Sequence, residues 1–552
     1  MFAYGPMPPL MFGGMILFLL FGFPVAFSLA AVGMTFAILG VLTEHFSFAF
    51  INALPLRFFG TISNELLLAI PFFTFMGAIL ERSGLAEDLL EGTGQLFGPL
   101  PGGIAYAVVL VGAVLGAITG TVAASVIAMG VVSLPVMMRY GYSKRMATGV
   151  IAASGTITQV IPPSLVLIIL ADQLGRSVGD MYKGAIGPAL LQILIFLIFI
   201  FVVSKLKPHL MPPLPPEART MSGRALVWKV AKAMVPSLAL IFVVLGTLFL
   251  GLATPTEAGA MGAIGGIILA IAHGRLSWTL MREAMAMTMR LTAMVIFILI
   301  GATVFSLVFQ GMDGGLWIEH LLSHIPGGAV GFLIFVNIFI FFVAFFLDFF
   351  EIAFIIVPLL VPVAESLGID LIWFGVLLCV NLQTSFMHPP FGFALFYLRG
   401  IAPKEIRSSD IYLGAVPWLC LQLLLVAILI FFPQSVTYFV TPERVVDPTS
   451  IQLNVPMPGD PSTSAPGQPS FGAPAAPSFG APPAPSFGAP AAPTFGSAPA
   501  APSFGAPASP SPNVAPAPAA PSFGAPSVAP PAAPTPVEPA PSVPSFGAPP
   551  SQ

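Results

Sequence analysis

Two stretches of the chain carry the same skeleton of prolines and glycine, with no insertion or deletion between them. Corresponding residues, such as 135 and 362, differ by 227 in number, and the matching sets are Pro135, Gly141, Pro162 and Pro163 with Pro362, Gly368, Pro389 and Pro390. In both copies the Pro-Pro pair interrupts a long apolar segment, at residues 146 to 172 and 371 to 398. Two successive prolines remove two amide donors and clash with the preceding turn, so a helix must open there. Because opened backbone survives in a bilayer only where protein or a polar cavity satisfies it, such paired segments indicate a transporter's binding site.

The composition is typical of a membrane protein. The chain is 57% hydrophobic and 8% charged, with a mean hydropathy of +0.95, whereas average soluble domains are about 25% charged. About eleven to thirteen apolar stretches of 15 or more residues are present, and a helix that spans a bilayer needs roughly 20. The sequence therefore predicts an all-α polytopic membrane protein whose first helix, from Leu10, is not a removable signal. Cys379 and Cys420 both lie in apolar segments, so neither a disulfide nor a metal site is expected from them.

Each broken segment is preceded by a long apolar element with a polar middle. Residues 104 to 138 are nearly uncharged and carry Thr119-Gly120-Thr121 at their centre, which fits a re-entrant hairpin or one over-long span. Residues 329 to 364 match this element at the same offset and carry Asp348 and Glu351 in their middle. The pattern predicts two hairpins, one for each broken helix. The number of crossings before residue 80 stays ambiguous.

The two repeats, about residues 64–206 and 291–432, are predicted to run in opposite directions. Four clear crossings and the second hairpin-like element separate the broken segments, which is an odd number of steps. Counting the hairpin as two crossings leaves the parity unchanged. Under this count the Lys- and Arg-rich loops share one face, which the positive-inside rule makes cytoplasmic; they are residues 139–145, 205–232, 275–290 and 399–407. Residues 311–327 carry no Lys or Arg and fall outside.

The composition changes abruptly at about residue 442, which divides a permease domain at 1–441 from a tail at 442–552. The tail is rich in Pro, Ala, Ser and Gly, and it repeats a Ser/Thr-Phe-Gly unit. Too few apolar residues are available to offset the ordering entropy, so the tail is predicted to be extended, disordered and dispensable for transport. The predicted topology places the tail outside, in the periplasm. Its phenylalanines are either contacts for a partner or part of an unselective spacer.

Two candidate half-sites follow from this layout, each made of a hairpin tip and the opening of a broken helix. Half-helix C-termini present carbonyls that suit Na⁺, and half-helix N-termini present N–H groups that suit a carboxylate. The candidate residues are Thr119, Gly120, Thr121, Ser154, Gly155, Thr156 and Pro162 in the first half-site, and Asp348, Asn381, Gln383, Thr384, Ser385, His388 and Pro389 in the second.

Structural roles compete with these assignments. Interhelical hydrogen bonding is the common role of a single Ser or Thr in a membrane bundle. Asp348 and Glu351 fit either a functional acid at membrane depth or a wet hairpin tip at the interface. His388 fits substrate binding, proton transfer or capping of the broken helix. Packing or a loop position is the first expectation for Glu65 and Glu257.

Long motifs resemble those of a known family, the large membrane subunit of tripartite ATP-independent periplasmic (TRAP) transporters. The resemblance covers about residues 10–435 and is carried by LLLAIPFFTFMGAILERSGLAEDL (66–89), GYSKRMATGVIAASGTITQVIPPS (141–164), GLATPTEAGA (251–260), LTAMVIFILIGATVFSLVF (291–309) and FGVLLCVNLQTSFMHPPFGFALFYLRGIAP (374–403). NLQTSF with PPFGFALFYL resembles the subgroup labelled for mannitol or chloroaromatic compounds.

The resemblance implies a Na⁺-driven elevator in the bacterial inner membrane, with no cofactor beyond Na⁺ as the coupling ion. It also implies a small organic carboxylate as substrate, a soluble periplasmic binding protein that delivers it and a small four-helix membrane subunit as partner, with no nucleic acid involved. The hairpin tip TGTVAAS departs from the serine-rich run of many members, and the Phe-Gly tail lies outside the family pattern. Proton coupling and a channel-like protein stay open as alternatives. An enzyme is not expected, because the apolar region holds no H-E-x-x-H, G-x-S-x-G or P-loop motif.

Overall fold

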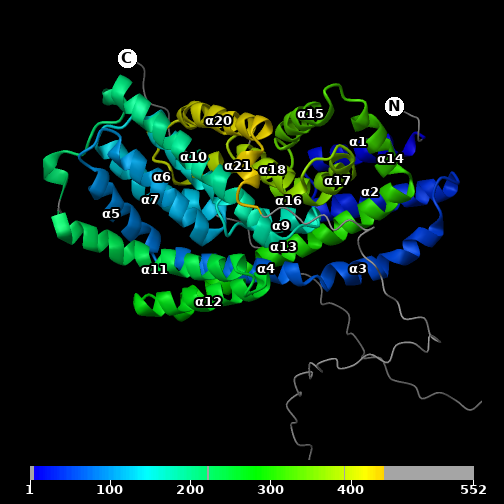
Figure 1. Ribbon diagram of the computed structural model, residues 1–552, viewed down its shortest axis with the longest axis horizontal. Helices are drawn as coiled ribbons and strands as arrows, with labels where there is room; N and C mark the ends of the chain where they lie inside the picture. Colours follow the sequence, from blue (N-terminus) through cyan, green and yellow to red (C-terminus); the bar gives the residue numbers. More distant parts are fainter. Residues whose placement is uncertain (1–4, 220–222, 391, 441–552) are drawn as a thin grey trace, which may run out of the picture. The chain divides into compact units, whose positions relative to one another are not determined.

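The computed structural model describes residues 5–219, 223–390 and 392–440, and these residues form helices and no strand (Figure 1). The predicted tail at 442–552 lies outside the described residues. Eight of the described helices are long and apolar enough to cross a membrane, or up to ten spans if each of two bent helix pairs is one span. The chain is therefore an all-α, multi-pass membrane protein, as predicted.

The helices before the first hairpin include the ambiguous crossings. They are α1 (Met7–Leu20), α2 (Val25–Leu42), η1 (Phe48–Ala53), α3 (Leu54–Ile62), α4 (Glu65–Arg82) and α5 (Leu85–Phe97), and the predicted first repeat begins among them with α4. The segment of η1 and α3 meets α4 at an angle of 44° across a short break, so by length and composition the two are either one broken span or a re-entrant loop. The side chain of Asn64 accepts a hydrogen bond from Leu66 N at 3.0 Å and caps α4, which explains the break at this residue.

The first repeat contains the predicted hairpin and broken helix. After α4 and α5 its helices are α6 (Gly103–Thr119), α7 (Val122–Arg139), α8 (Lys144–Thr156), η2 (Ile157–Gln159), α9 (Leu165–Gln173) and α10 (Val178–Leu206). Gly120 ends α6 with φ +64°, a left-handed conformation that favours glycine. Ile104 N at the start of α6 donates to the hydroxyl of Tyr142, just after α7, at 3.2 Å. Both open ends therefore lie together, and residues 104–138 form a hairpin and not one long span.

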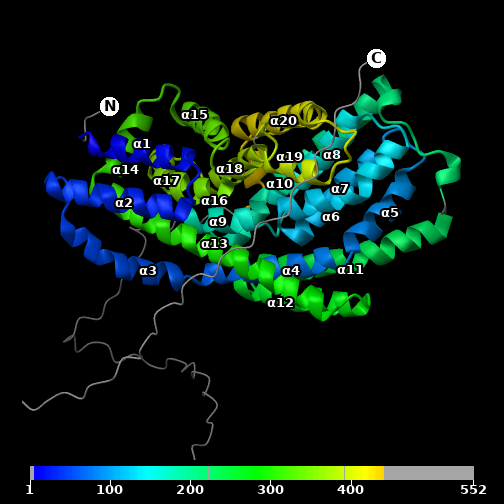
Figure 2. The ribbon, with the colours of Figure 1, turned by 180° about the vertical axis from the view of Figure 1, so that it is seen from behind.

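The second hairpin and broken helix follow after three long helices and one short one. These helices are α11 (Gly223–Phe249), α12 (Pro255–Ala272), α13 (Trp278–Gly311) and α14 (Gly314–Ser323), and the predicted second repeat begins within α13. The later helices are α15 (Gly328–Val343), α16 (Phe349–Glu351), η5 (Ile352–Ile356), α17 (Val357–Ser366), α18 (Leu371–Ser385), α19 (Phe393–Ile401), α20 (Ser408–Phe431) and α21 (Gln434–Thr437). Figures 1 and 2 show α4 beside α12 and α13, with α11 against α12.

The helix boundaries obey the sequence offset. α7 spans residues 122–139, and α16, η5 and α17 together span 349–366, so both ends differ by 227. α8 and α18 begin at 144 and 371, again 227 apart. Gly141 and Gly368, which precede these helices, both have positive φ values, +81° and +67°. The Pro162-Pro163 and Pro389-Pro390 peptide bonds are both cis. The repeat seen in the sequence is therefore a repeat of structure.

Contacts with α20 show that the repeats are inverted. Lys144 Nζ, at the start of α8, donates to Glu405 O, just before α20, at 2.6 Å. Trp373 Nε1, near the start of α18, donates to Leu429 O, near the end of α20, at 2.9 Å. A helix of 24 residues is about 36 Å long. Since the two broken helices begin at opposite ends of α20, they run in opposite directions.

The four basic loops lie on one face, as predicted. Ser143 N donates to Leu210 O at 2.9 Å, which joins the first loop to the second. The third loop reaches the second through α5, because Arg275 pairs with Asp88 at 3.5 Å and Lys229 with Glu91 at 2.8 Å. The Lys144 contact with Glu405 adds the fourth loop. We call this the basic face, and the side that holds residues 311–327 the far face.

Glu65 and Glu257 have structural positions, in line with the first expectation for each. The carboxylate of Glu257 accepts from Thr254 N at 2.8 Å, and the Thr254 hydroxyl accepts from Glu257 N at 3.3 Å. This reciprocal pair is a capping box for α12. Glu65 is the first residue of α4, and its backbone oxygen accepts from the Thr256 hydroxyl at 2.9 Å.

Candidate functional site

Both hairpin tips and both broken helices meet at one cavity of about 260 Å³, which we call the central cavity. Its walls come from the α6–α7 tip, the two breaks, the α15–α16 tip and one side of α13. The lining residues are Gly120, Thr121, Val122, Ala123, Gln159, Leu165, Val166, Leu291, Met294, Asp348, Phe349, Phe350, Phe386, Phe393 and Tyr397. Segments from both predicted half-sites, far apart in the chain, thus line one cavity.

Three of the predicted site residues line the central cavity: Gly120, Thr121 and Asp348. The other eleven are not among its described lining residues. They are Thr119, Ser154, Gly155, Thr156, Pro162, Asn381, Gln383, Thr384, Ser385, His388 and Pro389. Gln159, Phe386, Phe393 and Tyr397 line the cavity although the sequence analysis did not single them out. For Gln159, Phe386 and Phe393 the sequence did hold a signal, because each lies within four residues of a Pro-Pro pair.

A cluster of hydroxyl groups fastens the first hairpin tip to the first broken helix. Thr119 Oγ1 lies 2.8 Å from Ser125 Oγ, and the hydroxyl of Thr158 donates to Ser125 Oγ at 3.1 Å. Gly112 and Gly116 of α6 allow this approach, because a Cβ on Gly116 would lie 2.9 Å from the Cα of Thr158. Small residues commonly let membrane helices pack this closely. Thr119 therefore has the interhelical role that the sequence analysis left open.

Several buried oxygen atoms near the first half-site have no hydrogen-bond partner among the described residues. They belong to Ser154, Thr121 and Gln159, and the three atoms are Oγ, Oγ1 and Oε1. Thr121 and Gln159 line the central cavity. Buried polar atoms are nearly always paired, so these unpaired oxygens call for an explanation, and a bound ion or water is one of those available. Neutral oxygen atoms are the ligands that a hard cation such as Na⁺ accepts.

Asp348 and Glu351 form a capping box at the second tip. Asp348 Oδ1 accepts from Glu351 N at 3.0 Å, and Glu351 Oε2 accepts from Asp348 N at 3.1 Å. These bonds cap α16 and fix the tip that faces the central cavity. The pair thus closes the hairpin, while Asp348 also places one acid at the cavity wall.

The amide of Asn381 links α18 to the second hairpin. Asn381 Nδ2 donates to Asn337 O of α15 at 2.9 Å. The side-chain oxygens of both asparagines are buried and have no partner among the described residues. The hydroxyls of Thr384 and Ser385 donate to backbone oxygens one turn earlier, at 2.7 and 2.6 Å. Asn381 is therefore the member of this half-site whose side-chain oxygen has no partner among the described residues.

His388 lies fully buried between two phenylalanines of the second hairpin. Its ring centroid is 4.1 Å from that of Phe341 and 4.4 Å from that of Phe345. Neither ring nitrogen has a hydrogen-bond partner among the described residues. The side chain therefore does not cap the broken helix in this arrangement, and it does not line the central cavity.

A chain of buried amides crosses between the two repeats. The Gln192 and Gln383 side chains donate to each other at 2.6 and 3.1 Å. Gln422 Nε2 donates to Thr156 Oγ1 at 2.9 Å and to Gln383 Oε1 at 3.3 Å. The chain connects α8, α10, α18 and α20. Sequence reasoning identified Gln383 and Thr156 and missed Gln192 and Gln422, whose only signal is an amide within an apolar helix.

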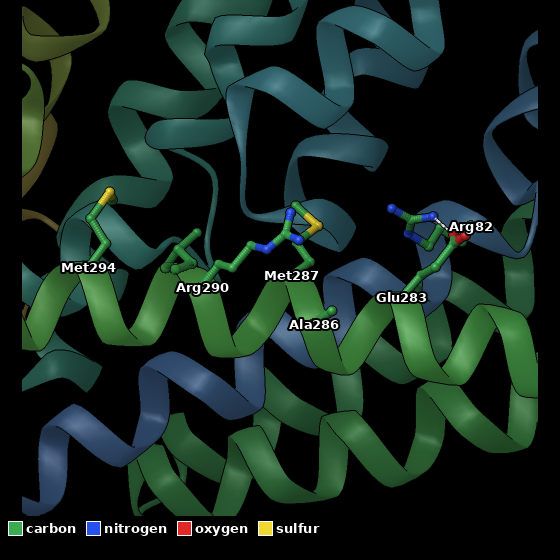
Figure 3. A pocket seen from close by; sticks show the side chains of 7 residues that line it. Arg82, Glu283, Ala286, Met287, Arg290 and Met294 are labelled. Atoms are coloured by element: carbon green, nitrogen blue, oxygen red, sulfur yellow. Dashed lines mark hydrogen bonds and ion pairs between the residues drawn. The ribbon is translucent and has the colours of Figure 1, made fainter. Parts of the chain in front are cut away.

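Two more cavities flank the central cavity along α13. The basic-side cavity, of about 490 Å³, is lined by Arg82, Glu283, Ala286, Met287, Arg290, Leu291 and Met294 (Figure 3). It shares Leu291 and Met294 with the central cavity. The far-side cavity, of about 430 Å³, is lined by Arg57, Gly60, Thr61, Asn64, Gln173, Leu299, Ala302, Thr303, Ser306, Gln310, Phe354 and Pro358. It shares no lining residue with the central cavity. The central cavity therefore adjoins the basic side.

Comparisons with known proteins agree with this architecture. The sequence profile described as "Tripartite ATP-independent periplasmic transporter, DctM component" matches residues 12–435. The chain is 29% identical over 385 residues to the C4-dicarboxylate TRAP transporter large permease protein DctM of Pseudomonas aeruginosa, covering 69% of this chain and 88% of that protein. It is 25% identical over 372 residues to the 2,3-diketo-L-gulonate TRAP transporter large permease protein YiaN of Escherichia coli, covering 67% and 85%.

One relative joins two subunits in a chain, and one solved structure shares the fold. The isethionate TRAP transporter permease protein DctMQ of Oleidesulfovibrio alaskensis is 29% identical over 439 residues, covering 78% of this chain and 66% of that protein. The crystal structure of the Alcanivorax borkumensis YdaH transporter superposes with a TM-score of 0.52 at 16% identity, covering 71% of this chain and 89% of that one. Its title reports an unusual topology.

Proposed function

Because the chain belongs to the DctM component family of tripartite ATP-independent periplasmic transporters, we propose that it imports a small organic anion, with a carboxylate as the first candidate, by Na⁺-coupled transport across the bacterial inner membrane. The family makes it a large permease subunit for solute uptake and not an enzyme. Relatives are named for C4-dicarboxylate, isethionate and 2,3-diketo-L-gulonate. Each of these compounds carries a carboxylate or a sulfonate, which supports an anionic substrate for this chain.

The observation that carries the proposal is the convergence of two inverted half-sites on the central cavity. Besides apolar side chains, the described lining holds the hydroxyls of Thr121 and Tyr397, the amide of Gln159 and the acid Asp348, and neither Lys nor Arg. An anion held there needs other positive charge, and Na⁺ ions at the unpaired oxygens of Ser154 and Asn381 would supply it. Na⁺ bound beside the substrate would favour joint transport, because each ion lowers the electrostatic cost of burying the other.

An elevator movement would explain the three cavities along α13. The central cavity touches α13 at Leu291 and Met294, and the far-side cavity touches it from Leu299 to Gln310. At a rise of 1.5 Å per residue, moving the contact from Leu291 to Thr303 is a shift of about 18 Å. Such a shift would carry the central cavity from the basic side to the far side. We propose that a periplasmic binding protein delivers the substrate there and that a small DctQ-like membrane subunit completes the permease.

The coupling ion is tested by removing a single unpaired hydroxyl. Ser154→Ala, assayed in proteoliposomes with the partner subunit and binding protein, should raise the Na⁺ concentration for half-maximal uptake severalfold. Ser237→Ala in α11 is the matched control, because Ser237 Oγ is also buried without a partner among the described residues but lies outside both repeats. Equal Na⁺ dependence in both variants and the native chain would remove Ser154 from the ion site.

Proton coupling is the second candidate, favoured by the acids at the second tip, of which Glu351 is buried and Asp348 half-buried, and by His388. It predicts uptake driven by a pH gradient in Na⁺-free buffer. Loss of that uptake in Asp348→Asn, with no response to Na⁺, would replace the Na⁺ proposal.

A further inference from the structure

Each of the two cavities that flank the central cavity along α13 contains an arginine with no acidic partner among the described residues. In the basic-side cavity the guanidinium of Arg82 pairs with Glu283, which leaves Arg290 without an ion-pair partner among the described residues (Figure 3). In the far-side cavity Arg57 is the single charged residue of the described lining. Its two terminal nitrogens reach the neutral oxygen Oε1 of Gln310, both at 3.4 Å. Each cavity therefore has one positive charge that no carboxylate of the described chain pairs with.

These arginines lie on or beside α13 and not in the two half-sites. Arg290 immediately precedes Leu291, which lines both the basic-side and the central cavity. Arg57 of α3 donates a hydrogen bond to Gln310, near the C-terminal end of α13. Arg290 and Gln310 are twenty residues apart on one helix, which corresponds to about 30 Å. The central cavity itself, which lies between these positions, has no cationic side chain in its described lining.

We infer that Arg290 and Arg57 are alternate counter-charges for the anionic group of the substrate. Arg290 meets it when the central cavity adjoins the basic side, and Arg57 meets it when the cavity adjoins the far side. This inference rests on the proposed function. A guanidinium presents a planar fork of donors that matches a carboxylate or sulfonate.

The far-side cavity has further groups that suit an oxyanion. Thr61, Thr303 and Ser306 place hydroxyls in the same lining. The nearest acid bonded to the lining is Asp172, which accepts from Asn64 Nδ2 at 2.7 Å and from Gln173 Nε2 at 2.8 Å. Those two amides face its negative charge, and Asp172 itself is not part of the described lining. The charge that a ligand meets is therefore that of Arg57.

Charged thiol reagents test the local charge without any transport. In a full-length chain that lacks Cys379 and Cys420, a reporter cysteine replaces Ser306 in the far-side cavity or Ala286 in the basic-side cavity. The rate of modification by the anionic sulfonatoethyl methanethiosulfonate is divided by the rate for the cationic trimethylammonium analogue. A unit charge about 6 Å away in water changes each rate about threefold in opposite directions. The ratio should therefore fall about tenfold when the local arginine becomes glutamine.

Each arginine variant serves as the control for the other. Arg57→Gln should lower the ratio at the Ser306 reporter and leave the Ala286 reporter unchanged, and Arg290→Gln should do the reverse. Succinate and benzoate, as carboxylate probes, should slow the anionic reagent only where the local arginine is present. A ratio that ignores the local arginine, or that responds equally to both, overturns the inference. So does a constant ratio with loss of a co-purifying membrane subunit in Arg57→Gln, because Arg57 then pairs with that partner.

The outcome is separable from that of the proposed function. If uptake proves not to depend on Na⁺ or on any carboxylate, local ratios that respond as above still establish two anion-accepting cavities. If uptake behaves as proposed and the ratios ignore the arginines, the counter-charge lies elsewhere.

Discussion

Removing one amide of the buried chain should destabilise the protein far more than removing another. In Gln383→Leu, both side-chain groups of Gln192 lose their partner, since Gln192 bonds to Gln383 in both directions. Each buried polar group left unpaired costs about 1–3 kcal/mol, so the variant should lose about 2–6 kcal/mol of unfolding free energy. Gln422→Leu leaves no other buried polar group without a hydrogen-bond partner. Thr156 still donates to Ala153 O at 2.9 Å, and the Oε1 that disappears had no partner among the described residues.

The expected loss for Gln422→Leu is therefore about 1 kcal/mol, the value of an ordinary hydrogen bond. The assay is unfolding of the purified chain in mixed micelles titrated with SDS, which gives a free energy for each variant. The double variant should cost less than the sum of the single losses, because Gln383 and Gln422 share a bond at 3.3 Å. An equal or larger loss for Gln422→Leu than for Gln383→Leu would refute the reasoning.

Two further perturbations follow from the packing and the protonation of the first hairpin. Gly116→Ala places a Cβ 2.9 Å from Thr158 Cα and should cost about 1–3 kcal/mol by overpacking, whereas Gly246→Ala in α11 meets no atom within 4 Å and should be neutral or stabilising; the same SDS titration compares them. Burial raises the pKa of Tyr142 to about 12 from its ordinary value of 10.0. The raised value means that folding favours the neutral phenol, so this stability is present below pH 10 and is lost as pH rises toward 12. Tyr142→Phe should abolish that alkaline loss in thermal unfolding, and an unchanged pH profile would contradict it.

The sequence predicted the repeat, its inversion and both hairpins because proline, glycine and charge act locally. Pro162-Pro163 and Gly141 constrain backbone wherever they occur, and an exact offset reveals that two segments share those constraints. The same reasoning found Gly120 and Asp348 at the cavity, because both belong to hairpin tips.

Contacts between distant helices could not be predicted in this way. Gln192 and Gln422 are single amides in apolar helices, and only the packing of α10 against α18 and α20 gives them partners. Tyr397 and Met294 line the central cavity because α19 and α13 bring them there. The bend between α3 and α4, which left the early crossings ambiguous, depends on the cap at Asn64, a signal that the hydropathy of the segment conceals.

The most direct test of the central claim is uptake of a radiolabelled carboxylate after the central cavity is filled. Thr121→Trp adds an indole at the first hairpin tip, within the lining of a cavity of about 260 Å³. Val131→Trp is the control, because Val131 lies on the same helix with 53% of its surface exposed. In proteoliposomes with the binding protein and the partner subunit, Thr121→Trp should abolish Na⁺-driven uptake and Val131→Trp should retain it. Native uptake by Thr121→Trp would contradict the claim that substrate passes through the central cavity.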